Sequence, residues 1–472
     1  MSAATENSEA VNRADAATDA AAPASAGSSS GRRQATAHVN ASTAVGLGAT
    51  AAPTAAPGPT PAAAPASTAV DFADLAAKYR PVFARIAEGS VERELERILP
   101  GDQIGWLKAS GFTAVRVPVS HGGDGASLPQ LFRLLVELAA ADSHVAQAIR
   151  GHLGFVEDRL YAPDSADRDE WLARFAAGQL VGNAVTEIGA VALGATNTRL
   201  DAAPGGFTIT GSKFYTTGSI FAEWIDATAI SPDGIEVAAL VSTAPDAVAI
   251  SDNWTGFGQR LTGSGTTVFT AAPVRAAHVY DFSERFPYQT ALYQLSLVAV
   301  LAGIARAAER DAADQVANRS RAFSHGNSPI TREDPQILDI VGRISADAFA
   351  AEAVTERAAQ SLQRAFDARD ASVNVRDRAK RETEIETAQA QIVVSQLTLG
   401  VTTRLFDGLG ASATGTSAAL DRHWRNARTV TSHNPVAFKA RIVGDYLVND
   451  AEPPYEWYVG VGAKPAAAPA PK

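Results

Sequence analysis

The sequence contains no cysteine, and its only methionine is Met1. Without cysteine the chain can form no disulfide bond, thiolate zinc site or iron–sulfur cluster, and it has no cysteine nucleophile. The histidines form no His-Glu-x-x-His set, so we expect no metal site. Three explanations of the missing sulfur remain open: compositional drift in an alanine-rich chain, protection from oxidation, and synthesis under sulfur limitation.

Long basic runs and long apolar runs are absent as well. The 472 residues include 41 Lys and Arg and 51 Asp and Glu, which gives a formal net charge of -10. This acidic balance argues against nucleic acid and against an anionic membrane surface as partners. No apolar run reaches the roughly 18 residues that a membrane span needs, and the N-terminal segment lacks the pattern of a secretory signal. We therefore expect a cytoplasmic protein with neither kind of partner.

What is present divides the chain into segments. Residues 1–70 lack Phe, Trp, Tyr, Ile and Lys, which predicts a disordered extension rich in Ala, Pro, Ser and Thr. Apolar residues spaced by three or four predict a helical domain over residues 71–180, whereas alternation predicts a β-domain over residues 181–285. Ala-rich helical stretches predict a bundle of four antiparallel helices over residues 286–450. Residues 451–472 form a C-terminal segment and an Ala/Pro tail.

Three local contexts combine groups that could carry chemistry. Ser432-His433-Asn434-Pro435 falls where a bundle helix should end, so its imidazole is either a proton-exchanging group near neutral pH or an ordinary capping histidine. Gly151-His152-Leu153 lies in an apolar stretch, where a hydrogen-bonded core histidine is the default. Lys213 to Gly218 places aromatic and hydroxyl groups at a strand end, which would suit a planar ligand or β-surface packing. Gly408 to Ala413 imitates a dinucleotide fingerprint but follows a helix, so it is a weak signal.

Four motifs follow one another in the order helical segment, β-segment, helical segment. They are Val117-Pro118-Val119-Ser120-His121-Gly122-Gly123-Asp124-Gly125, Asn183-Ala184-Val185-Thr186-Glu187, Gly211-Ser212-Lys213-Phe214-Tyr215-Thr216-Thr217-Gly218 and Arg425-Asn426-Ala427-Arg428. In this order they resemble the acyl-CoA dehydrogenase superfamily over residues 72–450. The resemblance implies an α+β fold with an N-terminal helical domain, a central β-barrel or β-sandwich domain and a C-terminal four-helix bundle. In such a fold a flavin lies between the β-domain and the bundle.

Two departures from the superfamily pattern indicate a branch. Asn434 stands about where acyl-CoA dehydrogenases commonly place a glutamate base, and an amide cannot abstract the α-proton of a thioester. The flavin-contacting Gln-x-x-Gly-Gly pattern is eroded, and Asp407 is a poor neighbour for a dinucleotide pyrophosphate. Both departures favour the branch of reduced-FMN-dependent monooxygenases that includes dibenzothiophene monooxygenase and related sulfur-acquisition oxidoreductases. The alternative is an FAD-dependent acyl-CoA dehydrogenase whose base lies elsewhere.

Further short motifs are similar to that branch. They are His152-Leu153, Gly182-Asn183-Ala184, Asn253-Trp254 before Gly258-Gln259-Arg260, Arg321, and Trp424 to Thr429 followed by His433-Asn434-Pro435. The chain differs from the branch at Asn434, which replaces Asp, at Val430, which replaces a second histidine, and at Thr217, which replaces Ser. The first two differences place the substrate in doubt more than the chemistry.

The resemblance implies roles for particular residues. His433 would be the acid–base group, His152 a second donor across the pocket, and Thr217 a hydrogen-bonding group near flavin N5. Arg321 would hold the phosphate by charge-assisted hydrogen bonds. The implied cofactor-binding residues are Asn183, Thr186, Thr217, Trp254, Arg321, Gly410, Ala411 and Ser412.

The resemblance also implies a reaction and its partners. An NAD(P)H-dependent flavin reductase would supply reduced FMN in trans, and FAD is the alternative cofactor. Oxygen would add at flavin C4a, and the resulting hydroperoxide would oxygenate a small organosulfur substrate. The fold implies a homotetramer formed through the bundle. Enzymes of this kind release sulfur from organic compounds, so the missing cysteine and methionine fit synthesis under sulfur limitation.

Overall fold

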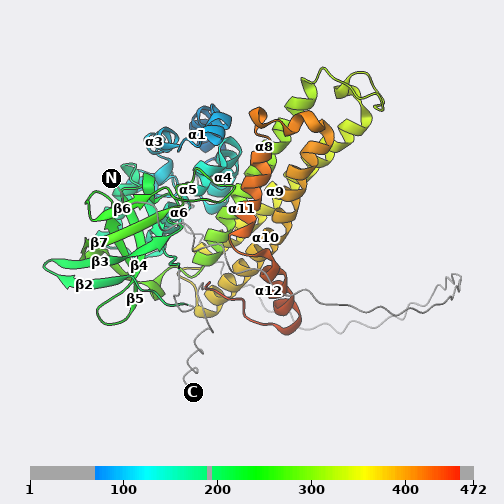
Figure 1. The fold of residues 1–472 in the computed structure, drawn as a ribbon. Helices are drawn as coiled ribbons and strands as arrows, with labels where there is room; N and C mark the ends of the chain where they lie inside the picture. The colour runs from blue at the N-terminus through cyan, green and yellow to red at the C-terminus, as the bar shows by residue number, and fades with distance from the viewer. Residues whose placement is uncertain (1–69, 189–193, 458–472) are drawn as a thin grey trace, which may run out of the picture. The chain divides into compact units, whose positions relative to one another are not determined.

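The computed structural model describes residues 70–188 and 194–457. The disorder predicted for residues 1–70 and the tail from residue 458 onward lie outside the described residues, apart from Val70. Within the described part, helices come first, strands follow and helices return (Figure 1). This arrangement confirms the predicted α+β fold class.

Seven α-helices precede the strands. They are α1 (Phe72–Ala87), α2 (Ser90–Glu96), α3 (Gly101–Ser110), α4 (Leu128–Ala141), α5 (Ser143–Ala148), α6 (Arg150–Tyr161) and α7 (Ala166–Ala176). The start of α4 shows why they form where they do. Ser127 accepts a hydrogen bond from the backbone N–H of Gln130, whose side chain accepts one from the N–H of Ser127, so two N–H groups of the first turn are satisfied.

Eight strands form one sheet. They are β1 (Val181–Ala184), β2 (Arg199–Ala203), β3 (Gly206–Phe214), β4 (Trp224–Ile230), β5 (Glu236–Ser242), β6 (Val248–Ser251), β7 (Thr266–Arg275) and β8 (Val279–Asp281). Their order is β6-β7-β3-β2-β4-β5-β8, and β1 pairs in parallel with β4. The sheet surrounds its own apolar core, in which Ile209, Ile225 and Phe269 from three different strands are fully buried.

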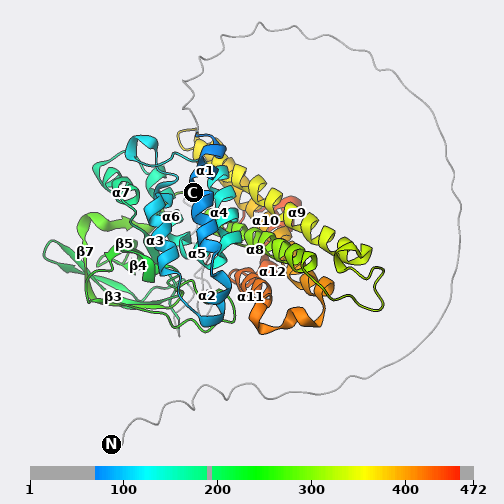
Figure 2. The ribbon, with the colours of Figure 1, turned by 90° about the horizontal axis from the view of Figure 1, so that it is seen from above.

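Five α-helices follow the sheet. They are α8 (Gln289–Ala317), α9 (Pro335–Asp367), α10 (Val373–Leu409), α11 (Asp421–Ser432) and α12 (Val436–Asn449). Helices α8, α9, α10 and α11 share one hydrophobic core with α4 (Figure 2). By length and composition α8 alone among the described helices could cross a membrane, but 89% of its most apolar window is buried inside the protein. Such burial is typical of the central helix of a bundle.

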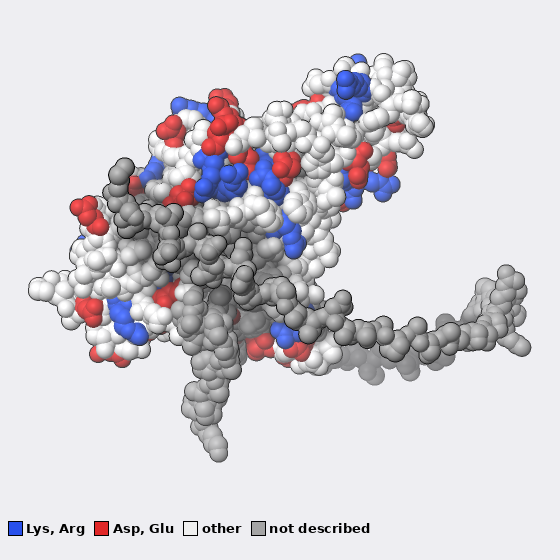
Figure 3. Space-filling view, in the orientation of Figure 1, with Lys and Arg blue, Asp and Glu red and all other residues white. Residues whose placement is uncertain are grey.

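Acidic and basic side chains lie interspersed on the face shown in Figure 3. Many of them pair locally, as Arg343 does with Asp339 one helical turn away at 2.8 Å. Pairs this exposed contribute little to stability. Buried ion pairs are therefore the charged contacts that can hold the elements of a site in place.

Candidate active site

His433 follows directly after α11, and its ring meets an arginine from the N-terminal helices. The Nε2 atom of His433 lies 3.3 Å from Nη2 of Arg150, the first residue of α6. A guanidinium can only donate, so Nε2 accepts this hydrogen bond and the ring is neutral. The Asn434 side chain forms a second hydrogen bond with the ring. The two partners therefore select one tautomer of His433.

The surroundings of His433 change the proton affinity expected from the sequence. Its pKa lies well below the ordinary histidine value, because protein atoms crowd the ring and the Arg150 charge repels a proton. The residue is nevertheless accessible to solvent. Without a ligand, His433 therefore does not exchange protons near neutral pH. A negative charge bound beside Arg150 would be needed to raise its pKa toward the ordinary histidine value.

Two glycines of α6 explain how other elements approach Arg150. A Cβ atom on Gly151 would lie 2.9 Å from Asn183 Oδ1 in β1, and one on Gly154 would overlap the Tyr293 hydroxyl in α8. The Arg150 guanidinium carbon lies 5.4 Å from the centre of the Tyr293 ring. β1, α8 and the end of α11 therefore meet at the first turns of α6.

The turn after β3 carries Thr217 to the same region. Tyr215 and Gly218 have positive φ values of 56° and 78°, and a Cβ atom on Gly218 would overlap the carbonyl oxygen of Ala148 at the end of α5. The Thr217 Oγ1 atom lies 2.6 Å from Ser264 Oγ, and Thr217 is buried. The structure thus holds the predicted Thr217 hydroxyl beside the junction between α5 and α6.

Thr186 and Trp254 border this turn from two sides. The carbonyl oxygen of Thr186 accepts a 2.7 Å hydrogen bond from the N–H of Phe214, the last residue of β3. The Trp254 ring packs edge-on against the Tyr215 ring, with centroids 5.8 Å apart, and its Nε1 donates to the carbonyl of Gly258 at 3.0 Å. The predicted ring-binding residues therefore lie on neighbouring segments.

His152 does not have the geometry of a second donor in the pocket. Its Nε2 donates to the carbonyl of Thr113 at 2.8 Å, and its Nδ1 accepts from the N–H of Val181 at 3.4 Å. The ring is buried, which lowers its pKa to about 4. Residues two apart in a helix point roughly 200° apart, so His152 faces away from Arg150. These contacts tie α6 to β1 and favour a positioning role for His152 over the predicted catalytic one.

The Arg-Asn motif of α11 anchors that helix. Arg425 Nη1 lies 2.7 Å from one carboxylate oxygen of Glu94 in α2, and His144 Nε2 of α5 lies 2.6 Å from the other. Burial alone would raise the pKa of Glu94, but these partners lower it to about 2. Asn426 accepts from the N–H of Gln259 at 2.6 Å. The cluster fixes the helix whose end carries His433.

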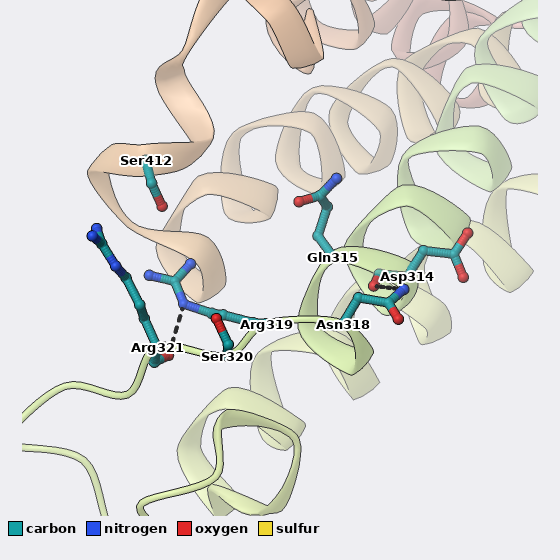
Figure 4. Close-up of a pocket in the computed structure, with 7 residues that line it drawn as sticks. All are labelled: Asp314, Gln315, Asn318, Arg319, Ser320, Arg321 and Ser412. Carbon is teal, nitrogen blue, oxygen red and sulfur yellow. Dashed lines mark hydrogen bonds between the residues drawn. The ribbon is translucent and has the colours of Figure 1, made fainter.

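Arg321 and Ser412 line a separate pocket. Its volume is about 290 Å³, and its lining comes from the end of α8, the loop that follows and the segment after α10 (Figure 4). Arg319 Nε donates to the carbonyl of Arg321 at 3.2 Å, which shapes the loop. The Arg321 guanidinium forms no ion pair with any residue that the structure describes. An unpaired arginine beside a serine hydroxyl suits a phosphate group.

Gly410 and Ala411 directly precede Ser412 in the chain but do not themselves line this second pocket. Gly410 ends α10 with a φ of 69°, and Ala411 begins the short 3-10 helix that contains Ser412. Neither lines the pocket itself. Their contribution is to place Ser412, the neighbouring residue that does.

The predicted cofactor residues therefore form two groups at opposite ends of α8. Arg150 contacts Tyr293 near the start of α8, whereas Arg321 follows its last residue, Ala317. At a rise of about 1.5 Å per residue, Tyr293 and Ala317 are about 36 Å apart. One ribityl chain joins the ring and the phosphate of FMN and is much shorter. Within one chain the two groups cannot hold the same FMN.

The sequence analysis missed Arg150. The signal was a single arginine in the mostly apolar stretch from Val145 to Phe155, where only the histidine two residues later was noted. A second feature that suits the site to a flavin, an unpaired amide oxygen, could not be predicted from the sequence either. The buried Oδ1 atom of Asn183 has no hydrogen-bond partner among the described residues, and an amide acceptor of this kind suits an N–H group of a flavin ring.

Comparison with known proteins finds relatives over most of the chain. Residues 295–438 match the family model for the acyl-CoA dehydrogenase C-terminal domain. The chain is 30% identical over 365 residues to a dibenzothiophene monooxygenase of Mycolicibacterium goodii, which covers 74% of this chain and 87% of that protein. It is 28% identical over 391 residues to SfnC of Pseudomonas putida, a probable FMNH2-dependent monooxygenase, with 80% and 96% covered.

Solved structures agree with these relatives. Methanesulfinate monooxygenase MsuC from Pseudomonas fluorescens superposes with a TM-score of 0.73 at 25% identity, covering 80% of this chain and 98% of that chain. FMN-bound TdsC from Paenibacillus sp. A11-2 superposes with a TM-score of 0.71 at 27% identity, covering 79% and 98%. One fold thus serves enzymes that differ in substrate.

Proposed function

Because the chain belongs to the FMNH2-dependent monooxygenase branch of the acyl-CoA dehydrogenase superfamily, we propose that it is the oxygenase of a two-component system. It is a flavin-dependent monooxygenase of sulfur-compound oxidation, and its cofactor is FMN. In the proposal, an NAD(P)H-dependent flavin reductase in the same cytoplasm supplies reduced FMN. The substrate is a small organosulfur compound.

The contact of His433 with Arg150 and Asn434 carries the proposal. A dehydrogenase acting on a thioester needs a carboxylate base, and the residue after His433 is an amide. No described carboxylate forms an ion pair with Arg150. The group is therefore suited to hold a proton near an oxygen atom rather than to remove one from carbon.

Reduced FMN, when bound, supplies the electrons that activate O2, so that one oxygen atom reaches the substrate and the other leaves as water. In the proposal, Asn183, Thr186 and Trp254 hold the ring, and Thr217 presents its hydroxyl to the ring edge. His433 would take up a proton at Nε2 and deliver it from there once a bound negative charge offsets the Arg150 charge. The Trp254 ring, held edge-on against the Tyr215 ring, would cover part of the bound flavin, and shielding from water would limit wasteful loss as hydrogen peroxide.

The phosphate of FMN requires a second copy of the chain in this proposal. Arg321 and Ser412 lie at the far end of α8 from His433. A homotetramer built through the helical bundle would bring the Arg321 pocket of one copy to the ring-binding residues of another. The separation of the two groups within one chain supports this arrangement.

The test is oxygenation by purified protein with FMN, a flavin reductase, NADH and ¹⁸O₂. Candidate sulfur compounds are supplied, and ¹⁸O incorporation and hydrogen peroxide are measured. We expect His433→Ala to bind FMN normally but to lose about 100-fold in oxygenation rate while releasing peroxide. Ser432→Ala is the matched control, because its exposed hydroxyl only bonds the carbonyl of Arg428. Normal turnover by His433→Ala would show that the assignment is wrong.

A further inference from the structure

Arg150 is a buried cation without a counter-charge. It is 8% exposed, its Nη2 donates to neutral His433, and its Nε has no acceptor among the described residues. The other buried arginines of the described chain are all paired: Arg93 with Asp142, Arg116 with Glu157 and Arg159 with Asp158. An arginine cannot shed its proton, so burial without an anion costs free energy.

Other unsatisfied polar atoms lie on the segments around Arg150. Gln147 Oε1, three residues earlier, and Asn183 Oδ1, which faces Gly151, are both buried and lack partners among the described residues. Both atoms are acceptors, so the ligand that completes them has to donate, as an N–H group of the flavin ring would. The Arg150 guanidinium, which has only a neutral histidine and an aromatic ring beside it, is therefore the group that an anion would complete.

We propose that Arg150 binds a negatively charged oxygen of the substrate, so that the substrate class is an organosulfur oxyanion such as a sulfinate. This inference rests on the proposed function. The fork of N–H groups on a guanidinium matches two oxygens of one anionic group. A neutral thiophene or sulfone would leave the Arg150 charge unpaired.

A sulfinate also satisfies the chemistry of the site. Its sulfur keeps a lone pair, which takes one oxygen atom of O2 and turns the sulfinate into a sulfonate. The second oxygen atom leaves as water with two electrons and two protons from reduced FMN. His433, bonded to Arg150, lies beside the bound anion, so the anion offsets the charge that lowers the pKa of this histidine.

Binding to the full-length protein without FMN tests the inference apart from turnover. Calorimetry compares methanesulfinate with its uncharged analogue dimethyl sulfone. We expect tighter binding of the sulfinate, and a loss of about 10- to 100-fold in sulfinate affinity in Arg150→Gln with no change for the sulfone. Arg150→Lys, which keeps the charge but loses the fork, should fall in between. Arg343→Gln, an exposed arginine of α9, is the matched control and should bind like the unaltered protein.

The main competing anion is the reduced flavin itself. If Arg150→Gln weakens the binding of reduced FMN under anaerobic conditions and leaves sulfinate affinity unchanged, the inference is overturned. Equal affinity of the unaltered protein for sulfinate and sulfone overturns it as well. Absence of oxygenation with an intact preference for sulfinate would refute the proposed function and leave the anion site standing.

Discussion

Arg116 and Arg150 are equally buried, at 8% exposure each, yet their surroundings differ completely. Arg116 meets both oxygens of Glu157 at 3.0 Å, and Glu157 also accepts from the Tyr288 hydroxyl at 2.7 Å. Arg150 has a neutral histidine and an aromatic ring. The charge of Arg116 is neutralised by Glu157, whereas no carboxylate of the described residues neutralises Arg150, whose counter-ion would be a bound ligand. Burial alone therefore does not distinguish a structural cation from a functional one.

The partners of the two arginines show what each holds together. Glu157 and Tyr288 link Arg116 to α6 and to the residue preceding α8, so this cluster joins the N-terminal helices to the bundle. Arg150 joins α6 to the residue after α11, which is where the proposed chemistry takes place. Removing one charge of the Arg116 cluster should destabilise the protein, whereas removing the Arg150 charge should not.

Breaking the paired cluster should have the largest effect. In Glu157→Gln the Arg116 charge stays buried without its partner, so we expect the free energy of unfolding to fall by about 3–5 kcal/mol. Urea unfolding followed by circular dichroism measures this loss. Glu356→Gln, on the exposed side of α9, should stay within about 0.5 kcal/mol of the unaltered protein. A loss below 1 kcal/mol in Glu157→Gln would remove the contrast between the two sites.

The two histidines extend the comparison to pH. Burial holds His152 neutral and lowers its pKa to about 4, below its ordinary value near 6.5. The unfolded chain therefore binds the proton first as the pH falls, and stability decreases between about pH 6.5 and 4. Between pH 7 and 5.5 the free energy of unfolding should therefore fall by about 1 kcal/mol less in His152→Gln than in the unaltered protein. Exposed His325 provides the control, since His325→Gln should keep the full slope.

The smallest effect should be the stability change in Arg150→Met. Replacing an unpaired buried charge by an apolar side chain of similar length should leave the free energy of unfolding unchanged or raise it by about 1 kcal/mol. The same replacement at Arg116 should lower it, because Glu157 would then be unpaired. Thermal and urea unfolding of both variants decide the matter. A fall of more than about 2 kcal/mol in Arg150→Met would make Arg150 a structural residue.

Local patterns were enough to predict the elements that surround the site. The three- and four-residue spacing of Leu131, Leu134 and Leu138 places them on the buried face of α4, and the polar run before His433 coincides with the end of α11. Thr217 and Thr186 were predicted through motifs at strand ends that resemble those of the superfamily. These features depend on neighbours in the chain, so a single sequence contains them.

The hydrogen bonds of His152 do not favour its predicted catalytic role, for a reason that also explains why Arg150 was missed. Both lie in one apolar stretch, and the motif drew attention to the histidine. Which of them points toward β1 and which toward α11 depends on the direction in which α6 packs. That direction follows from the close approach of Asn183 and Tyr293 at two glycines, which are distant in sequence.

The sequence by itself determined the order of helices and strands and the position of His433 at a helix end, because periodicity and turn residues are local properties of the chain. The family and FMN as the cofactor followed from the resemblance of its motifs to known enzymes. Only the tertiary structure showed that the predicted cofactor residues form two groups at opposite ends of α8, and that Arg150 lacks a counter-charge among the described residues while Arg116 has one. The physical reason is that charge pairing in a protein interior depends on which groups meet across distant segments. The spacing of residues along the chain does not show which distant residues come into contact.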